Sequence, residues 1–227
     1  MALKRGMLIV LEGNDRVGKT TQAKRLVEWL RDQGRKTRFI CFPDRSTPIG
    51  GLIDQYLKGE LKMHDHSIHL LFSANRWEKY EEMKAAIKSG ETIVVDRYSY
   101  SGVAYTASKA GADFEWARAP EKGLLKPDCV IFLSSDVKML QNRGDFGSEV
   151  YETSAFQNSV REIYHKLKED SWNVSNVFNV GVFRLFTNVF LQVIDANSRS
   201  IEEIHHDVIN AVKSKDNYWT SELGALW

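Results

Sequence analysis

Little in this chain of 227 residues points to a membrane, an oxidising compartment or a nucleic-acid partner. None of its apolar runs reaches the ~20 residues that a helix needs to span a bilayer. The apolar segment near the start, MLIVLEG, is too short for a signal peptide. A formal net charge of +1 without a polybasic tail gives no case for a nucleic-acid or membrane surface. We therefore expect a cytosolic protein that binds neither nucleic acid nor membrane, with a nuclear or mitochondrial pool left open.

Cysteine and proline are also scarce. The two cysteines, Cys41 and Cys129, are far apart and both lie in apolar runs. We interpret them as buried thiols in a reducing compartment, rather than as a disulfide or a pair of metal ligands. Only four prolines are present and no low-complexity linker interrupts the chain, so we expect a single domain over residues 1–227.

Apolar runs of strand length recur along the chain, at residues 7–13, 36–43, 91–98, 126–133 and within 190–196. They do not alternate with polar residues, which is typical of strands buried on both faces. Amphipathic stretches at 20–34 and 66–90, each ended by a glycine, predict helices between them. The pattern predicts an α/β fold with a parallel five-stranded sheet between two layers of helices. Ligands then bind beyond the carboxyl ends of the strands, near residues 13–21, 43–47, 96–98 and 195–200.

The segment GNDRVGKT, residues 13–20, fits the phosphate-loop pattern G-x-x-x-x-G-K-[ST]. It follows a predicted strand and precedes a predicted helix, which is the context that the motif requires. Glycines let successive backbone N–H groups face an anion, and the start of the helix adds a positive dipole end. Lys19 supplies a charge for the β- and γ-phosphates, and the Thr20 hydroxyl is a ligand for Mg²⁺. The sequence therefore predicts a nucleoside triphosphate site.

Further cations and aromatic residues follow the next strands or lie on one helical face. They are Arg45, Phe72, Arg76, Arg97 and Tyr105, and Ser101 shares the helical spacing of Arg97 and Tyr105. One triphosphate does not require so many cationic and aromatic side chains. Guanidinium groups suit the binding of a second phosphate, and an aromatic ring suits a stacked base. Taken singly, each arginine could be a surface ion pair, Phe72 a core residue and Asp96 a helix cap. Together they indicate a nucleotide acceptor whose phosphate faces the γ-phosphate of the donor.

Several segments, in order and in spacing, resemble the eukaryotic thymidylate kinases. They are LIVLEGNDRVGKTTQ, FPDRSTPIGGLI, HLLFSANRWE, VDRYSYSGVAYT, LLKPDCVIFL and the closing LGALW, so the resemblance runs from about residue 5 to the end. It implies a P-loop kinase fold with a short lid at about residues 134–157. It also implies transfer of the γ-phosphate of Mg·ATP to dTMP, giving dTDP and ADP for dTTP synthesis, by a homodimer.

The resemblance implies roles for individual residues. Asp15 binds the 3′-hydroxyl of the acceptor, and Arg16 reaches the transferring phosphate as an internal arginine finger. Phe72 stacks on thymine, Arg76 hydrogen-bonds it, and Tyr105 lies near the 2′-position. The implied catalytic residues are Arg16, Lys19, Asp96 and Arg97, with Thr20 and Asp96 at Mg²⁺, the latter through water. The implied ATP site is Gly13, Arg16, Val17, Gly18, Lys19, Thr20, Thr21, Arg143 and Arg199. The implied dTMP site is Asp15, Phe42, Arg45, Phe72, Arg76, Arg97, Ser101, Gly102, Tyr105, Tyr151 and Gln157.

Two segments need separate comment. In the lid, Gly144 and Gly147 are expected to be pliable points, and Arg143 to lie over the adenine or the phosphates. Residues 175–192 depart from the family as an apolar, Asn-rich insertion with one charge, Arg184. It is an ordered packed insertion, a flexible loop, or sequence foreign to the main functional form, and its composition favours the last. The adenine contacts expected near Asn197–Ser200 survive if VFLQVIDA supplies the usual strand in register.

Two other functions deserve comparison. The first is a kinase for another deoxynucleoside or another nucleoside monophosphate. A nucleoside kinase would not need paired arginines such as Arg45 and Arg97 on an acceptor phosphate. A nucleotide-regulated switch needs a water-orienting residue and partner-facing loops, and nothing between Pro43 and Asp65 indicates them. The switch also leaves the predicted acceptor pocket unexplained.

Overall fold

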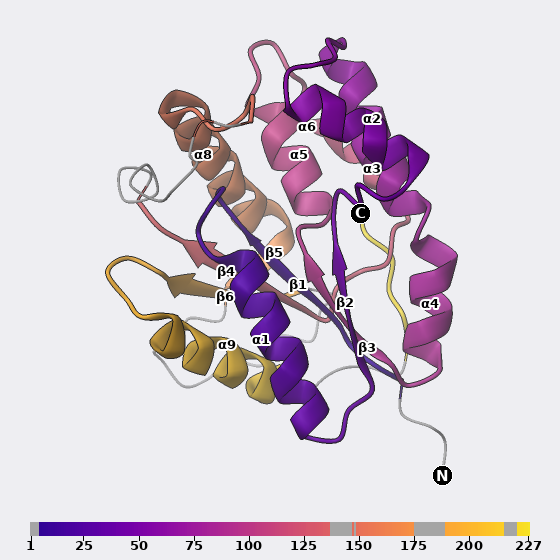
Figure 1. Ribbon diagram of the computed structural model, residues 1–227, viewed down its shortest axis with the longest axis vertical. Helices are drawn as coiled ribbons and strands as arrows, with labels where there is room; N and C mark the ends of the chain where they lie inside the picture. The colour runs from indigo at the N-terminus through magenta and orange to yellow at the C-terminus, as the bar shows by residue number, and fades with distance from the viewer. Residues whose placement is uncertain (1–4, 137–146, 148, 175–188, 216–221) are drawn as a thin grey trace.

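The computed structural model describes residues 5–136, 147, 149–174, 189–215 and 222–227, and these form a twisted sheet with helices on both faces (Figure 1). The described strands pair in the order β2-β3-β1-β4-β6-β5, and every pairing is parallel. Their bounds are β1 Leu8–Gly13, β2 Thr37–Cys41, β3 Thr92–Asp96, β4 Cys129–Ser134, β5 Trp172–Val174 and β6 Val189–Asp195.

The helices cover the sheet because alternate strand residues face opposite sides. In β1, Leu8 and Val10 pack against one apolar layer, and Ile9 and Leu11 against the other. Figure 1 shows α4, α5 and α8 over the first layer and α1 and α9 over the second. The described helices are α1 (Lys19–Asp32), α2 (Pro48–Leu57), α3 (Asp65–Trp77), α4 (Tyr80–Lys88), α5 (Ser99–Ala107), α6 (Phe114–Arg118), the short 3-10 helix η1 (Ala119–Glu121), α8 (Ser154–Ser171) and α9 (Ile201–Lys215).

The predicted fold class is confirmed, and the five predicted runs are the five longer strands. Two details differ. A sixth strand, β5, adds to the sheet edge beside β6, and its three residues are too few to produce a detectable pattern. The helix predicted over 66–90 is divided into α3 and α4. At the division, the Lys79 N–H bonds the carbonyl of Arg76, three residues back, so the backbone tightens there.

The interpretation of both cysteines as buried is wrong for Cys41. Cys129 is buried, whereas Cys41 is exposed, because it is the last residue of the edge strand β2 and its side chain meets a cavity beyond the sheet. The boundaries of a single domain over 1–227 stay a prediction. No described helix has the length and apolar character to cross a bilayer.

The strand register brings the predicted site segments to one edge. Leu11 pairs with Asp96 across β1 and β3, and Gly13 with Leu133 across β1 and β4. Ser134 pairs with Asp195, so VFLQVIDA does supply strand β6 beside β4. Residues 175–188 of the predicted insertion lie outside the described residues. The carboxyl ends of these parallel strands therefore form one platform for a ligand.

Candidate active site

The phosphate loop joins β1 to α1 with the geometry that its glycines permit. Gly13 has φ 140° and Gly18 has φ 101°, and a Cβ on Gly13 would lie 2.3 Å from the carbonyl oxygen of Leu133. In the described part of the chain, no side chain caps the N-terminus of α1, and no acid lies in its first turn. Its amides and dipole therefore favour an anion at this point.

Lys19 is buried and donates a 2.6 Å hydrogen bond to the carbonyl of Asn14, within the loop itself. Burial, followed by the charge of Arg97, lowers the pKa of Lys19 to about 8. The ammonium group therefore stands at the loop as a poorly solvated cation, and an arriving phosphate would stabilise it.

Thr20 and Asp96 form a polar pair where α1 begins and β3 ends. The Thr20 hydroxyl donates to Oδ2 of Asp96. Oδ1 of Asp96 is buried and accepts no hydrogen bond from the described residues. A hydroxyl and an unpaired carboxylate oxygen beside a phosphate loop fit Mg²⁺, which takes oxygen ligands and keeps several waters. Among the described residues, no group of three or more His, Cys, Asp or Glu forms a dedicated cage, so nucleotide phosphates would complete such a site.

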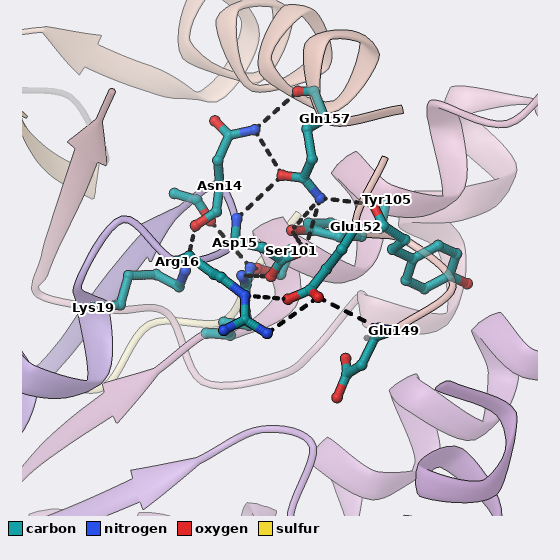
Figure 2. Close-up of polar contacts among 12 residues, drawn as sticks. Asn14, Asp15, Arg16, Lys19, Ser101, Tyr105, Glu149, Glu152 and Gln157 are labelled. Carbon is teal, nitrogen blue, oxygen red and sulfur yellow. Dashed lines mark hydrogen bonds and ion pairs between the residues drawn. The ribbon is translucent and has the colours of Figure 1, made fainter. Parts of the chain in front are cut away.

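Asp15 connects the loop to the acceptor side. It forms an ion pair with Arg97 through Oδ1, and Oδ2 accepts from the Tyr105 hydroxyl at 2.9 Å and from Gln157 Nε2 at 2.7 Å. Figure 2 shows Gln157 of α8 between Asn14, Asp15 and Tyr105. Burial acts to raise the pKa of Asp15, but Arg97, Lys19 and these hydrogen bonds lower it below its usual value. The carboxylate is thus held ionised between α5, α8 and the loop.

Arg97 is positioned by backbone as well as by side chain. Its φ of 64° lies in the left-handed region, and its N–H donates to the carbonyl of Leu11. The guanidinium then donates to the carbonyl of Gly13 and to the Ser101 hydroxyl, both at 3.1 Å. A left-handed arginine is costly, and such backbone is typical of functional sites.

The other arginines of the site are also paired with carboxylates. Arg16 bonds Glu152, which lies within the predicted lid segment, at 2.8 Å (Figure 2). Arg45 pairs with Asp54 of α2 and with Glu149, the latter at 2.6 Å. Arg76, on α3, forms a buried ion pair with Glu121. Each carboxylate keeps a guanidinium group oriented. A phosphate carries the same sign of charge as a carboxylate and can accept the same hydrogen bonds from arginine.

A cavity of about 240 Å³ lies between these groups. Its cationic wall is formed by Arg16, Lys19, Arg45 and Arg97. A second, largely aromatic part of the wall consists of Phe42, Phe72, Tyr98, Tyr105 and Tyr151, and Arg76, His69, Ser101 and Gly102 also line the cavity. A flat group inside would meet aromatic faces while an anion met the guanidinium groups.

Comparison with known proteins identifies the family to which this chain belongs. The family model described as thymidylate kinase matches residues 11–182. This chain belongs to the thymidylate kinase family. It is 46% identical to the thymidylate kinase of Danio rerio over 208 residues, which cover 92% of this chain and 90% of the relative. It is 43% identical to that of Homo sapiens over 230 residues, covering 100% of both. The solved structure of the thymidylate kinase from Candida albicans superposes with a TM-score of 0.82 at 31% identity, covering 98% of this chain and 99% of the other.

The family resemblance implied a set of residues for the acceptor site. Most of them line the cavity, and Gln157 borders it through its contacts with Asp15 and Tyr105. Arg199 lies elsewhere. It donates to the carbonyls of Asp195 and Glu203 and pairs with Asp207 at 2.8 Å, around the start of α9. Its role in binding ATP stays a prediction. Arg143 and Gly144 lie outside the described residues, and Gly147 has φ 99° with its N–H on Glu152.

Several buried groups that support the site carry little recognisable signal in the sequence. Glu12 is fully buried, and its carboxylate accepts from the backbone N–H groups of Tyr98 and Ser101 and from the Ser101 and Tyr164 hydroxyls. Burial raises its pKa above the ordinary value. The only available signal was its place directly before Gly13. Glu121, Glu149, Glu152 and His69 were also missed, because their partners are distant in sequence.

Proposed function

We propose that this thymidylate kinase family member transfers the γ-phosphate of ATP to dTMP, giving dTDP and ADP. The observation that carries the proposal is the joint contact of Asp15 and Arg97, which ties the phosphate loop to a cavity with a cationic and an aromatic wall. A triphosphate on the loop and a nucleoside monophosphate in the cavity would then meet at Lys19, Arg16 and Arg97.

The residues act by positioning and charge. The loop amides and Lys19 bind the donor phosphates, while Arg45 and Arg97 hold the acceptor phosphate in line. Arg16 exchanges Glu152 for the transferring group, whose charge it then stabilises. No general base is required, because a phosphate monoester with a second pKa of about 6 is largely ionised at neutral pH.

Thr20, and Asp96 through water, would hold Mg²⁺, which would supply charge neutralisation for the phosphates. Its support is the unpaired Oδ1 of Asp96. Asp15 would receive the 3′-hydroxyl of the acceptor, with Tyr105 beside the 2′-position. Phe72 and Arg76 would contact the thymine, and Tyr151 and Gln157 would flank the acceptor.

We also propose a homodimer on the family resemblance. Leu52 of α2 and Leu70 of α3 are exposed apolar side chains that a subunit contact would cover. Light scattering on the purified protein measures the assembly, and a monomer at micromolar concentration would contradict it. The cytosolic location stays a prediction.

A coupled ADP-release assay tests the activity across dTMP, dUMP, dCMP, dAMP, dGMP and thymidine. We expect dTMP to be the best acceptor and thymidine, which has no phosphate, to be inactive. Thymidine used better than dTMP would indicate a nucleoside kinase. No ADP release with any of the monophosphates would overturn the proposal.

A further inference from the structure

Asn75, on α3, makes contacts that none of the proposed roles uses. Its side chain is fully buried. Its amide oxygen accepts from the backbone N–H of Asp44 at 2.7 Å, and its amide nitrogen contacts the Asp44 carbonyl at 3.3 Å. The same nitrogen contacts the Thr47 hydroxyl and a Glu78 carboxylate oxygen, each at 3.0 Å. One side chain therefore pairs with both backbone polar groups of a single loop residue, as a neighbouring strand would.

The loop that Asn75 holds is the one that carries Arg45. Asp44 immediately precedes Arg45, and the other side of the loop packs closely on α2. A Cβ on Gly50 would lie 1.8 Å from the Asp44 carbonyl oxygen and 2.9 Å from the Cα of Arg45. Thr47 also accepts from the Gly50 N–H and so caps α2. The backbone of Arg45 is thus fixed between α2 on one side and Asn75 on the other.

The far end of Arg45 is held differently. The Arg45 side chain is 42% exposed, and its guanidinium pairs with Asp54 and Glu149. Ion pairs at exposed positions contribute little and exchange readily. A phosphate can therefore displace Glu149. The guanidinium group is in the correct place for that phosphate only if the backbone of Arg45 is fixed. Asn75 supplies that support without itself lining the cavity.

We propose that Asn75 is a positioning residue for Arg45, and hence for the phosphate of the acceptor. The proposal rests on the proposed function. Because Asn75 directly precedes Arg76, one turn of α3 then supports both ends of the acceptor: Arg76 faces the base, and Asn75 sets the arginine at the phosphate.

A double-mutant cycle tests this role. Asn75→Ala, Arg45→Ala and the double variant are compared with wild type for kcat and for the KM of dTMP and of ATP. We expect Asn75→Ala to raise the KM for dTMP by about tenfold to a hundredfold, since small displacements of a binding group have effects of that size. The KM for ATP should change less than about twofold. In the Arg45→Ala background, the same substitution should add little.

Two further variants complete the design. Asn158→Ala, at an exposed asparagine of α8, is the matched control and should behave as wild type. Asn75→Ser keeps an uncharged hydroxyl that can pair with only one of the two Asp44 backbone groups, so it should give an intermediate KM for dTMP even if the alanine variant does not fold. Equal effects of Asn75→Ala in both Arg45 backgrounds, or parallel rises in both KM values, would overturn the positioning role. A wild-type protein inactive on dTMP would overturn the proposed function and this role together.

Discussion

At the scale of single residues, the site is a set of guanidinium groups already paired with carboxylates. The pairs are Arg16–Glu152, Arg45–Glu149, Arg76–Glu121 and Arg97–Asp15. They differ in burial, from the fully enclosed Arg76 pair to the exposed Arg45 pair. A phosphate can replace the exposed partners more readily than the enclosed ones, because breaking a buried pair leaves an uncompensated charge. Arg76 and Glu121 therefore act as one fixed unit.

Arg97→Ala should damage acceptor use far more than donor binding. We expect kcat/KM for dTMP to fall about a hundredfold to a thousandfold, as for the loss of a charge-stabilising donor, while the dissociation constant of ATP stays within about threefold. The coupled assay gives the first value and calorimetric titration the second. Arg25→Ala removes an arginine from a surface pair with Glu202 and should change neither. Equal losses in both measurements would contradict the acceptor role of Arg97.

His69 predicts a pH dependence of stability. Its Nε2 bonds the carbonyl of Ala117 at 2.9 Å, and its Nδ1 contacts the Thr106 hydroxyl at 2.7 Å. Since the carbonyl only accepts, Nε2 carries a proton, and in the neutral ring Nδ1 accepts from the Thr106 hydroxyl. Burial is the main cause that lowers the pKa of His69 from 6.5 to about 4.

Between pH 6.5 and 4 the unfolded chain therefore binds a proton at residue 69 that the folded chain excludes. Stability is retained above this window and falls as the pH drops through it, by about 3 kcal/mol in total. His69→Gln, which offers a donor and an acceptor without titrating, should lose that part of the slope. Urea unfolding at several pH values measures the difference between the two proteins. Parallel curves for both would sink this assignment.

At the scale of elements, β1 supports α5 as well as the phosphate loop. No side chain of α5 caps its own start, within the part of the chain that the structure describes. Glu12, the residue before Gly13, instead accepts from the N–H groups of Tyr98 and Ser101. One carboxylate of the central strand thus places the helix that carries the acceptor-facing hydroxyls of Ser101 and Tyr105.

Glu12→Ala should lower the free energy of unfolding by about 2–4 kcal/mol, because it leaves several buried donors without an acceptor. Glu12→Gln, which keeps one carbonyl oxygen, should lose less. Denaturant unfolding followed by circular dichroism measures both. Glu202→Ala provides the control, since that carboxylate is exposed at the start of α9. A loss no larger than that of the control would show that α5 does not depend on this cap.

The longer elements could be predicted from the sequence because strands buried on both faces leave continuous apolar runs. Strand β5 could not, since three residues carry no period. The bend between α3 and α4 has neither glycine nor proline at Glu78–Lys79 to announce it. The phosphate loop was predictable because its chemistry is local. Asn75 and Glu12 were not, because their partners lie 31 and 86 residues away, and only the folded chain brings them together.

At the scale of the whole molecule, binding of dTMP should stabilise the folded chain. A ligand at about 100 times its dissociation constant adds about 2.7 kcal/mol, which corresponds to a rise of about 5–10 °C in Tm for a domain of this size. Differential scanning fluorimetry with dTMP and with thymidine separates the phosphate contribution. Thymidine should give a smaller shift, since it leaves Arg45 and Arg97 with their carboxylates. Identical shifts would mean that these arginines do not meet the acceptor.

The two thiols differ in solvent exposure, and this difference can be used to detect binding in the cavity. Cys41 opens onto the cavity, whereas Cys129 is enclosed. Partial desolvation and nearby Asp96 raise the pKa of the Cys41 thiol to about 11, and burial raises that of Cys129 to about 12. The raised pKa values slow both thiols, but only Cys41 is exposed, so a maleimide dye at mildly alkaline pH should attach slowly and once to the native chain and twice to the denatured one. The initial rate of that attachment, compared with and without dTMP, would show whether the nucleotide covers Cys41, without any engineered label.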